Sequence, residues 1–284
     1  YCSMNRLVII GNGFDMAHGL RTSYMDFINW YWDQRVYGFI GNTTNVSQDC
    51  LCKLVIKETG DFSCWNVFAA SNSYFFKDLY QKERYSGSEV FQEIKQHPET
   101  FMVECSPFFE TILQSIESKG WVDIENDYYQ LLKDSINNPR CEYTITGLNQ
   151  QLAFIQSKLV EYLSTIKEGE YKSEYQKAIT DYFNPDDFST EGRVRALDNM
   201  GLDFDRPYDK QYFQEEHEKL APERIMLLSF NYTKTAQLYG GSNVVHNYIH
   251  GGLTRPETII FGYGDELDKN YQDILDKNNN ELLK

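Results

Sequence analysis

The stretch LVIIGNGFDMAHGL, residues 7–20, decides the fold prediction for this chain. Its four apolar residues, Leu7 to Ile10, run directly into a glycine-bearing turn, a pattern typical of a buried strand in a parallel sheet. Glycines at such a turn indicate either a positive backbone φ or the close approach of another group. Beyond the turn, Ser23 and Asp26 have the spacing of a helix capping box. Strand, glycine turn and helix in this order predict the opening of a nucleotide-binding α/β sheet.

The length and charge of the chain narrow its possible functions. With 284 residues, of which 41% are hydrophobic, it can form one large α/β domain or one domain with an insertion. The net charge of −15 repels phosphate backbones, so general nucleic-acid binding is not expected. A small anionic ligand remains compatible with this charge, because backbone amides at the start of a helix can hold it locally. The apolar runs are far shorter than a membrane helix requires, and the first residues do not resemble a signal peptide. We therefore expect a cytoplasmic protein without a membrane partner.

The cysteines indicate free thiols. The chain has six, and the closest group is Cys50, Cys52 and Cys64, with no histidine nearby. A structural zinc site usually needs four ligands at tighter spacing, so no metal is expected. Free thiols in a reducing cytoplasm are the simpler interpretation.

The arrangement of apolar segments predicts a split core. Short β-rich runs occur at 224–230, 243–249 and 257–261, far from the first strand. We expect residues 1–35 and 222–284 to form a Rossmann-like parallel-sheet core.

Residues 36–221 would then form a mainly helical insertion. Within it, 38–87 has no clean period and is interpreted as irregular with short helices, and 186–206 is polar and loop-like. Apolar periodicity predicts helices over 108–116, 120–134, 146–166, 171–183 and 208–220.

Three polar segments follow predicted strands. They are Gly11 to Asp15, SFNYTKT at 229–235 and YIHGG at 248–252. Ligands of open α/β sheets bind at the carboxyl ends of the strands, so these segments form a candidate ligand site.

The same motifs support a family resemblance. IIGNGFDMAHGLRTSY, followed by SFNYTKT and IHGG, resembles the AbiH family of bacterial abortive-infection proteins, which act in phage defence. GWVDIENDYY, at 120–129, resembles a W-x-D-x-E segment of that family. The resemblance implies an anti-phage protein, and the partners to consider are a phage-derived trigger and a second copy of the chain.

A more distant resemblance concerns chemistry. GNGFDMAHGL is similar to the opening of sirtuins, FNYT to their asparagine motif, IHGG to their histidine-glycine and RPETIIFG to the segment that follows. It implies a sirtuin-like NAD-binding core in which NAD is substrate or ligand and Asn231 and His250 are catalytic. His250 would serve as general base, its reference pKa being ~6.5. The implied cofactor-binding residues are Gly11, Asn12, Gly13, Phe14, Asp15, Gly19, Thr233 and Gly251.

Because the chain departs from the sirtuin pattern in three places, the resemblance does not decide whether it is catalytic. The four-cysteine zinc module is absent, Thr233 replaces an aspartate and Asp15 replaces a serine. The alternatives are an NAD glycohydrolase and a non-catalytic nucleotide sensor or interaction module. Each of these residues also has a simpler structural interpretation: the glycines shape a turn, Asp15 and Asn231 cap helices, and His250 packs in a core. His18 is expected at the surface or in packing, and the face formed by Trp121, Glu125 and Tyr128 is expected to pack between domains.

Overall fold

The computed structural model describes residues 4–40, 45–57, 85–119, 124–138, 143–215 and 220–261. The chain divides into two compact units. Tyr1–Arg21 with Ile166–Ile260 form the first, called the sheet unit here, and Thr22–Thr165 with Phe261–Lys284 form the second, called the helical unit.

These two units have other boundaries than the predicted domains. The expected core took in residues 22–35 and the segment from Phe261 onward, which the structure assigns to the helical unit. The expected insertion took in residues 166–221, which the structure assigns to the sheet unit.

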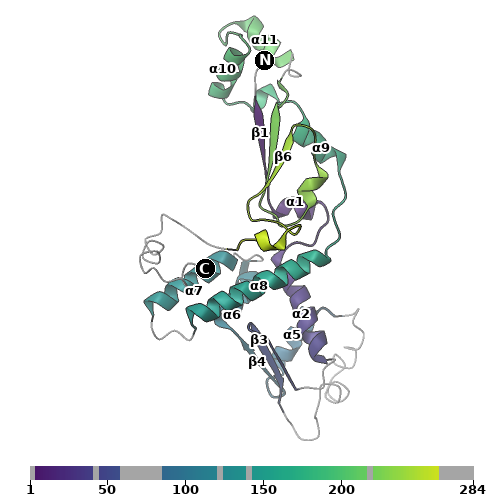
Figure 1. Cartoon of the computed structure of the whole chain (residues 1–284), viewed down its shortest axis with the longest axis vertical. Coiled ribbons are helices and arrows are strands. Elements are labelled where there is room, and N and C mark those ends of the chain that lie inside the picture. Colours follow the sequence, from purple (N-terminus) through teal and green to yellow (C-terminus); the bar gives the residue numbers. More distant parts are fainter. Residues whose placement is uncertain are drawn as a thin grey trace. The chain divides into compact units, whose positions relative to one another are not determined.

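A three-stranded parallel sheet organises the sheet unit (Figure 1). Its strands are β1 (Asn5–Ile10), β5 (Arg224–Ser229) and β6 (Val244–Tyr248), in the order β1-β5-β6, and both neighbouring pairs are parallel. The mixed α/β class with a parallel sheet is therefore confirmed. The strand predicted before the first turn and the strands predicted at 224–230 and 243–249 are confirmed as well.

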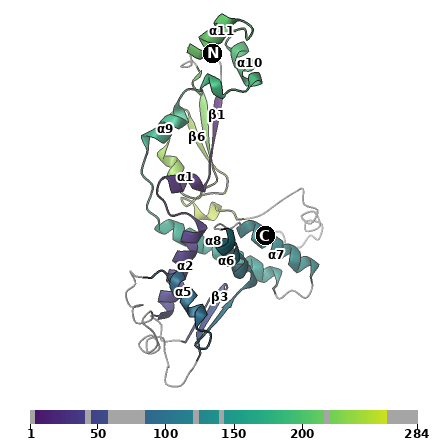
Figure 2. The same cartoon turned by 180° about the vertical axis from the view of Figure 1, so that it is seen from behind.

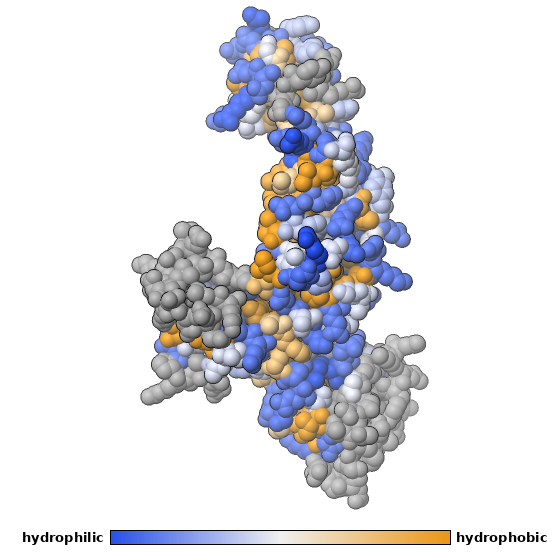
Figure 3. All heavy atoms as spheres, in the orientation of Figure 1, coloured by the Kyte–Doolittle hydropathy of each residue, from blue (hydrophilic) through white to orange (hydrophobic). Residues whose placement is uncertain are grey.

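The two faces of this sheet differ. On one face, a core forms from Ile10, Ile225 and Leu227 together with Ile179 of α9 (Ser173–Thr180). Figure 2 shows α9 and α1 (Asn12–Ala17) beside the strands from the other side. Side chains on the opposite face are exposed, and hydrophobic residues reach the surface of this unit (Figure 3). The exposed apolar residues of the strands are Leu7, Ile9, Met226 and Val245.

Two predictions within the sheet unit are wrong. The run at 257–261 forms no strand. Its beginning lies in the 3-10 helix η4 (Pro256–Thr258), where Pro256 takes the first helical position, which its fixed φ suits. The segment 186–206 contains helix α10 (Thr190–Asn199), whose first turn is capped by the hydroxyl of Ser189.

Burial of its apolar residues explains why α10 forms, although the polar sequence of this segment predicts a loop. Ala196 and Leu197 of α10 pack with Phe213 of α11 (Pro207–Glu215) in a small satellite core. Tertiary packing of this kind outweighs the weak local preference of a polar segment. The described residues of this unit also include the short 3-10 helices η1 (Pro185–Asp187) and η3 (Thr235–Leu238).

The helical unit contains a second sheet that the sequence interpretation missed. Strands β2 (Val46–Gln48), β3 (Cys52–Ile56) and β4 (Phe101–Cys105) pair antiparallel in the order β2-β3-β4. Within the stretch expected to be irregular, the described residues 45–57 therefore hold the strands β2 and β3. In β3, buried and half-buried residues alternate, because one face lies on the core.

The described residues of this unit also form five helices. The Ser23 hydroxyl accepts a hydrogen bond from the Asp26 amide at 3.1 Å, which confirms the predicted cap of the first of them. Trp32 stacks on Phe91 with ring centroids 3.5 Å apart, and this joins that first helix to the one that begins at Gly87. The helices are α2 (Tyr24–Ile40), α5 (Gly87–Gln96), α6 (Pro107–Lys119), α7 (Ile124–Asn137) and α8 (Ile145–Thr165).

The helices predicted over 108–116, 120–134 and 146–166 thus correspond to α6, α7 and α8. Trp121 lies outside the described residues. The hydroxyl of Tyr128 on α7 donates to the side chain of Asn149 on α8. Among the residues that the structure describes, no helix has both the length and the hydropathy to cross a bilayer.

Candidate functional site

The candidate site lies where three parallel strands end. Ile10 of β1 pairs in register with Ser229 of β5, and Ser229 pairs with Tyr248 of β6. The three predicted polar segments therefore leave the sheet from one edge. This arrangement brings residues from the two ends of the sequence together, as the prediction of a site at the strand ends required.

Asn231 connects the segment after β5 to the first turn. Its side-chain amide donates a hydrogen bond to the carbonyl oxygen of Gly11 at 2.9 Å. The same carbonyl accepts from the amide of Phe14 at 2.9 Å, so that amide is already used within the chain. Because the Asn231 side chain contacts the turn after β1, its role here is to tie two strand ends together.

Asp15 forms the second link between the same segments. Its Oδ2 atom accepts a hydrogen bond from the Thr233 hydroxyl at 2.6 Å. The Thr235 hydroxyl oxygen lies 3.2 Å from that of Thr233. The Asp15 side chain is 1% exposed, and its Oδ1 atom has no partner within the part of the chain that the structure describes. Burial raises the pKa of the nearby Tyr248 phenol, and the Asp15 carboxylate adds to that rise. A carboxylate with one unpaired buried oxygen is costly and calls for an explanation.

The glycines of the motif fall into two groups. Gly19 and Gly251 have φ of +78° and +75°, where other residues are strained, so the backbone itself requires them. A Cβ on Gly251 would also lie 2.1 Å from the carbonyl oxygen of Thr258. By contrast, a Cβ on Gly11 or Gly13 would meet nothing within 4 Å, and neither has a positive φ. The chain's own geometry therefore gives no reason for glycine at 11 and 13.

His250 lies among aromatic residues. Its ring centroid is 5.6 Å from that of Phe230 and 6.4 Å from that of Tyr232, and it is partly exposed. Contacts alternate along residues 230–233, which follow β5. Asn231 and Thr233 face the first turn, whereas Phe230 and Tyr232 face His250. The structure thus places the two predicted catalytic side chains against different neighbours.

His18 is a buried residue that anchors α1. Its Nδ1 lies 2.6 Å from the carbonyl oxygen of Phe14, and its Nε2 lies 2.5 Å from the hydroxyl of Tyr239. A carbonyl can only accept, so Nδ1 donates to it, and in the neutral imidazole the Tyr239 hydroxyl donates to Nε2. The Tyr239 oxygen in turn accepts from the amide of Lys172 at 3.1 Å. The expectation of a packing role for His18 agrees with this, although no local pattern could reveal a partner 221 positions away.

No metal centre is found among the described residues, where no three His, Cys, Asp or Glu side chains gather as ligands. Cys50, Cys52 and Cys105 are free thiols. Cys64, the third member of the predicted cysteine group, lies outside the described residues.

These features define an α/β protein whose candidate site lies at the carboxyl edge of a parallel sheet. A family model described as "Bacteriophage abortive infection AbiH" matches residues 7–284, and the chain belongs to that family. This membership supports a role in abortive infection, that is, in defence against phage. No curated protein matches the chain, and no solved structure does.

Proposed function

We propose that this AbiH-family protein binds NAD at the carboxyl edge of its sheet unit and hydrolyses it as part of phage defence. The core would then be Rossmann-like, with a sirtuin-like arrangement of its ligand site. The hydrogen bond from Asn231 to Gly11 carries the proposal, because it joins the two motifs that such a site needs.

Space and shape support binding. The positions of Gly11 and Gly13 are open, so a pyrophosphate can approach the backbone where a side chain would block it. Two strand spacings separate β1 from β6, a span of about 10 Å that a dinucleotide bridges. Phe230 is partly exposed beside His250 and offers a face on which a base can stack.

The chemistry required is simple. Water adds to the ribose carbon that bears nicotinamide, the carbon–nitrogen bond breaks through an oxocarbenium-like state, and the water's proton leaves to a base. The products are nicotinamide and ADP-ribose. Asn231 is held by its amide nitrogen, which leaves its amide oxygen to orient water, and the His250 imidazole accepts the proton.

A second candidate is binding without cleavage, as in a nucleotide sensor. The alternating contacts of residues 230–233 favour it, because Asn231 and His250 contact different groups. In this form the ligand would change the protein's interactions, and a phage-derived trigger or a second copy of the chain would be the partner.

Calorimetry and nicotinamide release separate these candidates. We expect the wild-type protein to bind NAD and release nicotinamide, Asn231→Ala to lose both, and His250→Ala to lose release while retaining binding. Asn247→Ala, at an exposed position of β6, and His97→Ala, in the helical unit, are matched controls and should behave like wild type. Binding without release by wild type selects the sensor. Absence of any binding of NAD, NADP or ADP-ribose overturns both candidates.

A further inference from the structure

A pair of thiols lies across two strands of the helical unit. Cys52 of β3 and Cys105 of β4 are partners in the antiparallel register, and their sulfur atoms are 3.6 Å apart. Both are free. A disulfide has a sulfur–sulfur distance of about 2.05 Å, so a small movement of the two side chains would bring them to bonding distance.

The backbone at this pair suits a disulfide. The Cys52 carbonyl accepts from the Asp49 amide, and the Cys52 amide donates to the Asp49 side chain. Both groups therefore point away from β4, while the carbonyl of Leu51 accepts from Ser106 beyond the end of β4. Cys52 and Cys105 are thus a non-hydrogen-bonded pair, whose Cα atoms lie about 4.5 Å apart in antiparallel sheets. That spacing is within the range of about 4.4–6.8 Å that disulfides span.

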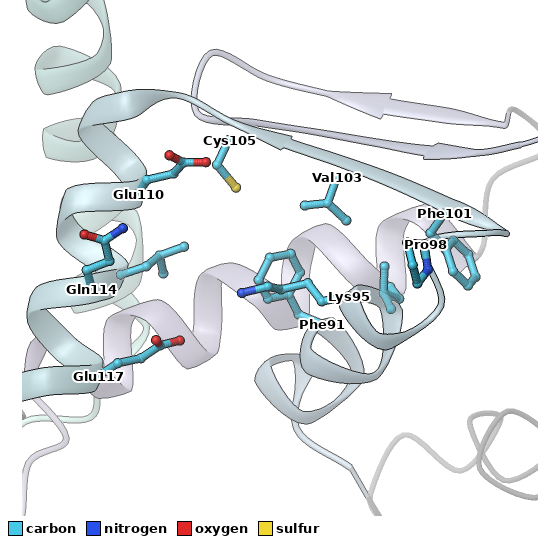
Figure 4. A pocket seen from close by; sticks show the side chains of 11 residues that line it. Phe91, Lys95, Pro98, Phe101, Val103, Cys105, Glu110, Gln114 and Glu117 are labelled. Atoms are coloured by element: carbon cyan, nitrogen blue, oxygen red, sulfur yellow. The ribbon is translucent and has the colours of Figure 1, made fainter.

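One of the two thiols is accessible and the other is not. Cys105 lines a pocket of about 410 Å³ between β4, α5 and α6, and Figure 4 shows its side chain pointing into that pocket. Lys95 and Glu110 line the same pocket. Cys52 is 2% exposed and is not among the residues that line it. A small solute therefore reaches Cys105 first.

The surroundings also favour ionisation of Cys105. When Cys105 loses its proton, the Cys52 thiol donates a hydrogen bond to the resulting thiolate, and this lowers the pKa of Cys105. The Lys95 ammonium acts in the same direction, whereas burial and the Glu110 carboxylate oppose it. Cys52 consequently stays protonated until a sulfur atom beside it becomes electrophilic.

We propose that Cys52 and Cys105 form a peroxide-reactive dithiol, with Cys105 as attacking thiol and Cys52 as resolving thiol. The Cys105 thiolate attacks one oxygen of hydrogen peroxide, the oxygen–oxygen bond breaks, and hydroxide leaves with the electron pair. Cys105 is then a sulfenic acid. The Cys52 sulfur, having lost its proton to hydroxide, displaces the second hydroxide to give the disulfide. Two thiols are oxidised, one peroxide is reduced, and two water molecules form.

The disulfide would fix the strand pair at its end. Asp49 holds the start of β3 through the Leu51 and Cys52 amides and forms an ion pair with Arg35 at 3.2 Å. Arg35 also donates to the carbonyl of Cys52. A covalent bond at the same point would join β4 to this polar group, so oxidation should stabilise the helical unit.

Peroxide titration of the full chain tests the proposal. After oxidation, alkylation and peptide mapping, we expect a Cys52–Cys105 cross-linked peptide that forms before Cys50 reacts and disappears on reduction with dithiothreitol. In Cys52→Ser the expected product is a sulfenic acid at Cys105, trapped with dimedone, and in Cys105→Ser peroxide should leave Cys52 unmodified. Cys50→Ser is the matched control and should give the same cross-link as wild type.

Two results would overturn the proposal, and both can be read from wild-type protein without any variant. The first is recovery of Cys52 and Cys105 as free thiols at peroxide concentrations that oxidise Cys50. The second is oxidation of Cys105 to the sulfinic acid with Cys52 still free, which would show that the pair does not close.

Discussion

The Thr233 hydroxyl donates a 2.6 Å hydrogen bond to the carboxylate of Asp15, across 218 positions of the sequence. Both side chains are buried, and the bond joins the helix after β1 to the segment after β5. An aspartate at position 233 would put a second carboxylate against Asp15, so the contact favours an uncharged hydrogen-bond donor there.

Thr233→Val should destabilise the sheet unit. The substitution keeps the shape of the side chain but removes the donor, which leaves a buried carboxylate without its hydrogen bond at a cost of about 1–3 kcal/mol. Urea unfolding measures this loss. Thr233→Ser keeps the hydroxyl and should lose less than half as much. Equal stability of Thr233→Val and the wild-type protein would mean that the bond contributes nothing.

Gly251→Ala should be strongly destabilising. Its positive φ costs a residue with a Cβ about 1–2 kcal/mol, and the carbonyl of Thr258 occupies the space that the methyl group would need. Thermal unfolding provides the measurement. Gly240→Ala is a suitable comparison, because a Cβ there meets nothing within 4 Å, and it should change stability little. A Gly251→Ala protein as stable as wild type would contradict the geometry of this turn.

Gly13→Ala should separate folding from ligand binding. Gly13 lies inside α1, where alanine is favoured over glycine by roughly 0.5–1 kcal/mol, and the position is open. Stability should therefore rise or stay the same. If NAD approaches the backbone at this turn, the added methyl group should weaken NAD binding at least tenfold by calorimetry. Unchanged affinity in a stable Gly13→Ala protein would place any nucleotide site elsewhere.

The thiols should ionise in an order that exposure alone does not predict. Desolvation by the atoms around its sulfur and the Asp49 carboxylate raise the pKa of the Cys50 thiol, although the residue as a whole is exposed. The Cys52 hydrogen bond and Lys95 lower the pKa of Cys105. Only the thiolate reacts with iodoacetamide, so each rate rises as pH increases through the pKa of that thiol. The Cys105 rate should rise at lower pH than the Cys50 rate.

Lys95→Gln tests the cause of this order. Removal of the ammonium should move the Cys105 profile to higher pH without altering the Cys50 profile. Lys133→Gln, on α7, removes an equal charge elsewhere and should change neither profile. Coincident profiles for the two thiols in the wild-type protein would refute the predicted order.

Local sequence predicted the elements whose signals are local. The apolar run Leu7 to Ile10 followed by a glycine turn was enough for β1, and the spacing of Ser23 and Asp26 was enough for the cap of α2. Periodic leucines predicted α8 for the same reason. By contrast, the alternation in β3 was missed because the strand is short and its partner β4 begins 45 positions further along.

The sequence by itself determined the parallel strands, the long helices and the three polar strand ends, because hydrophobic periodicity and glycine position act over a few neighbouring residues. Only the tertiary structure decided which side chains meet at those ends. Asn231 with Gly11, Thr233 with Asp15, and Cys52 with Cys105 are pairs between distant segments, and their partners depend on strand order and register. No local pattern specifies that order, since it follows from burying one apolar face of each sheet against its own core.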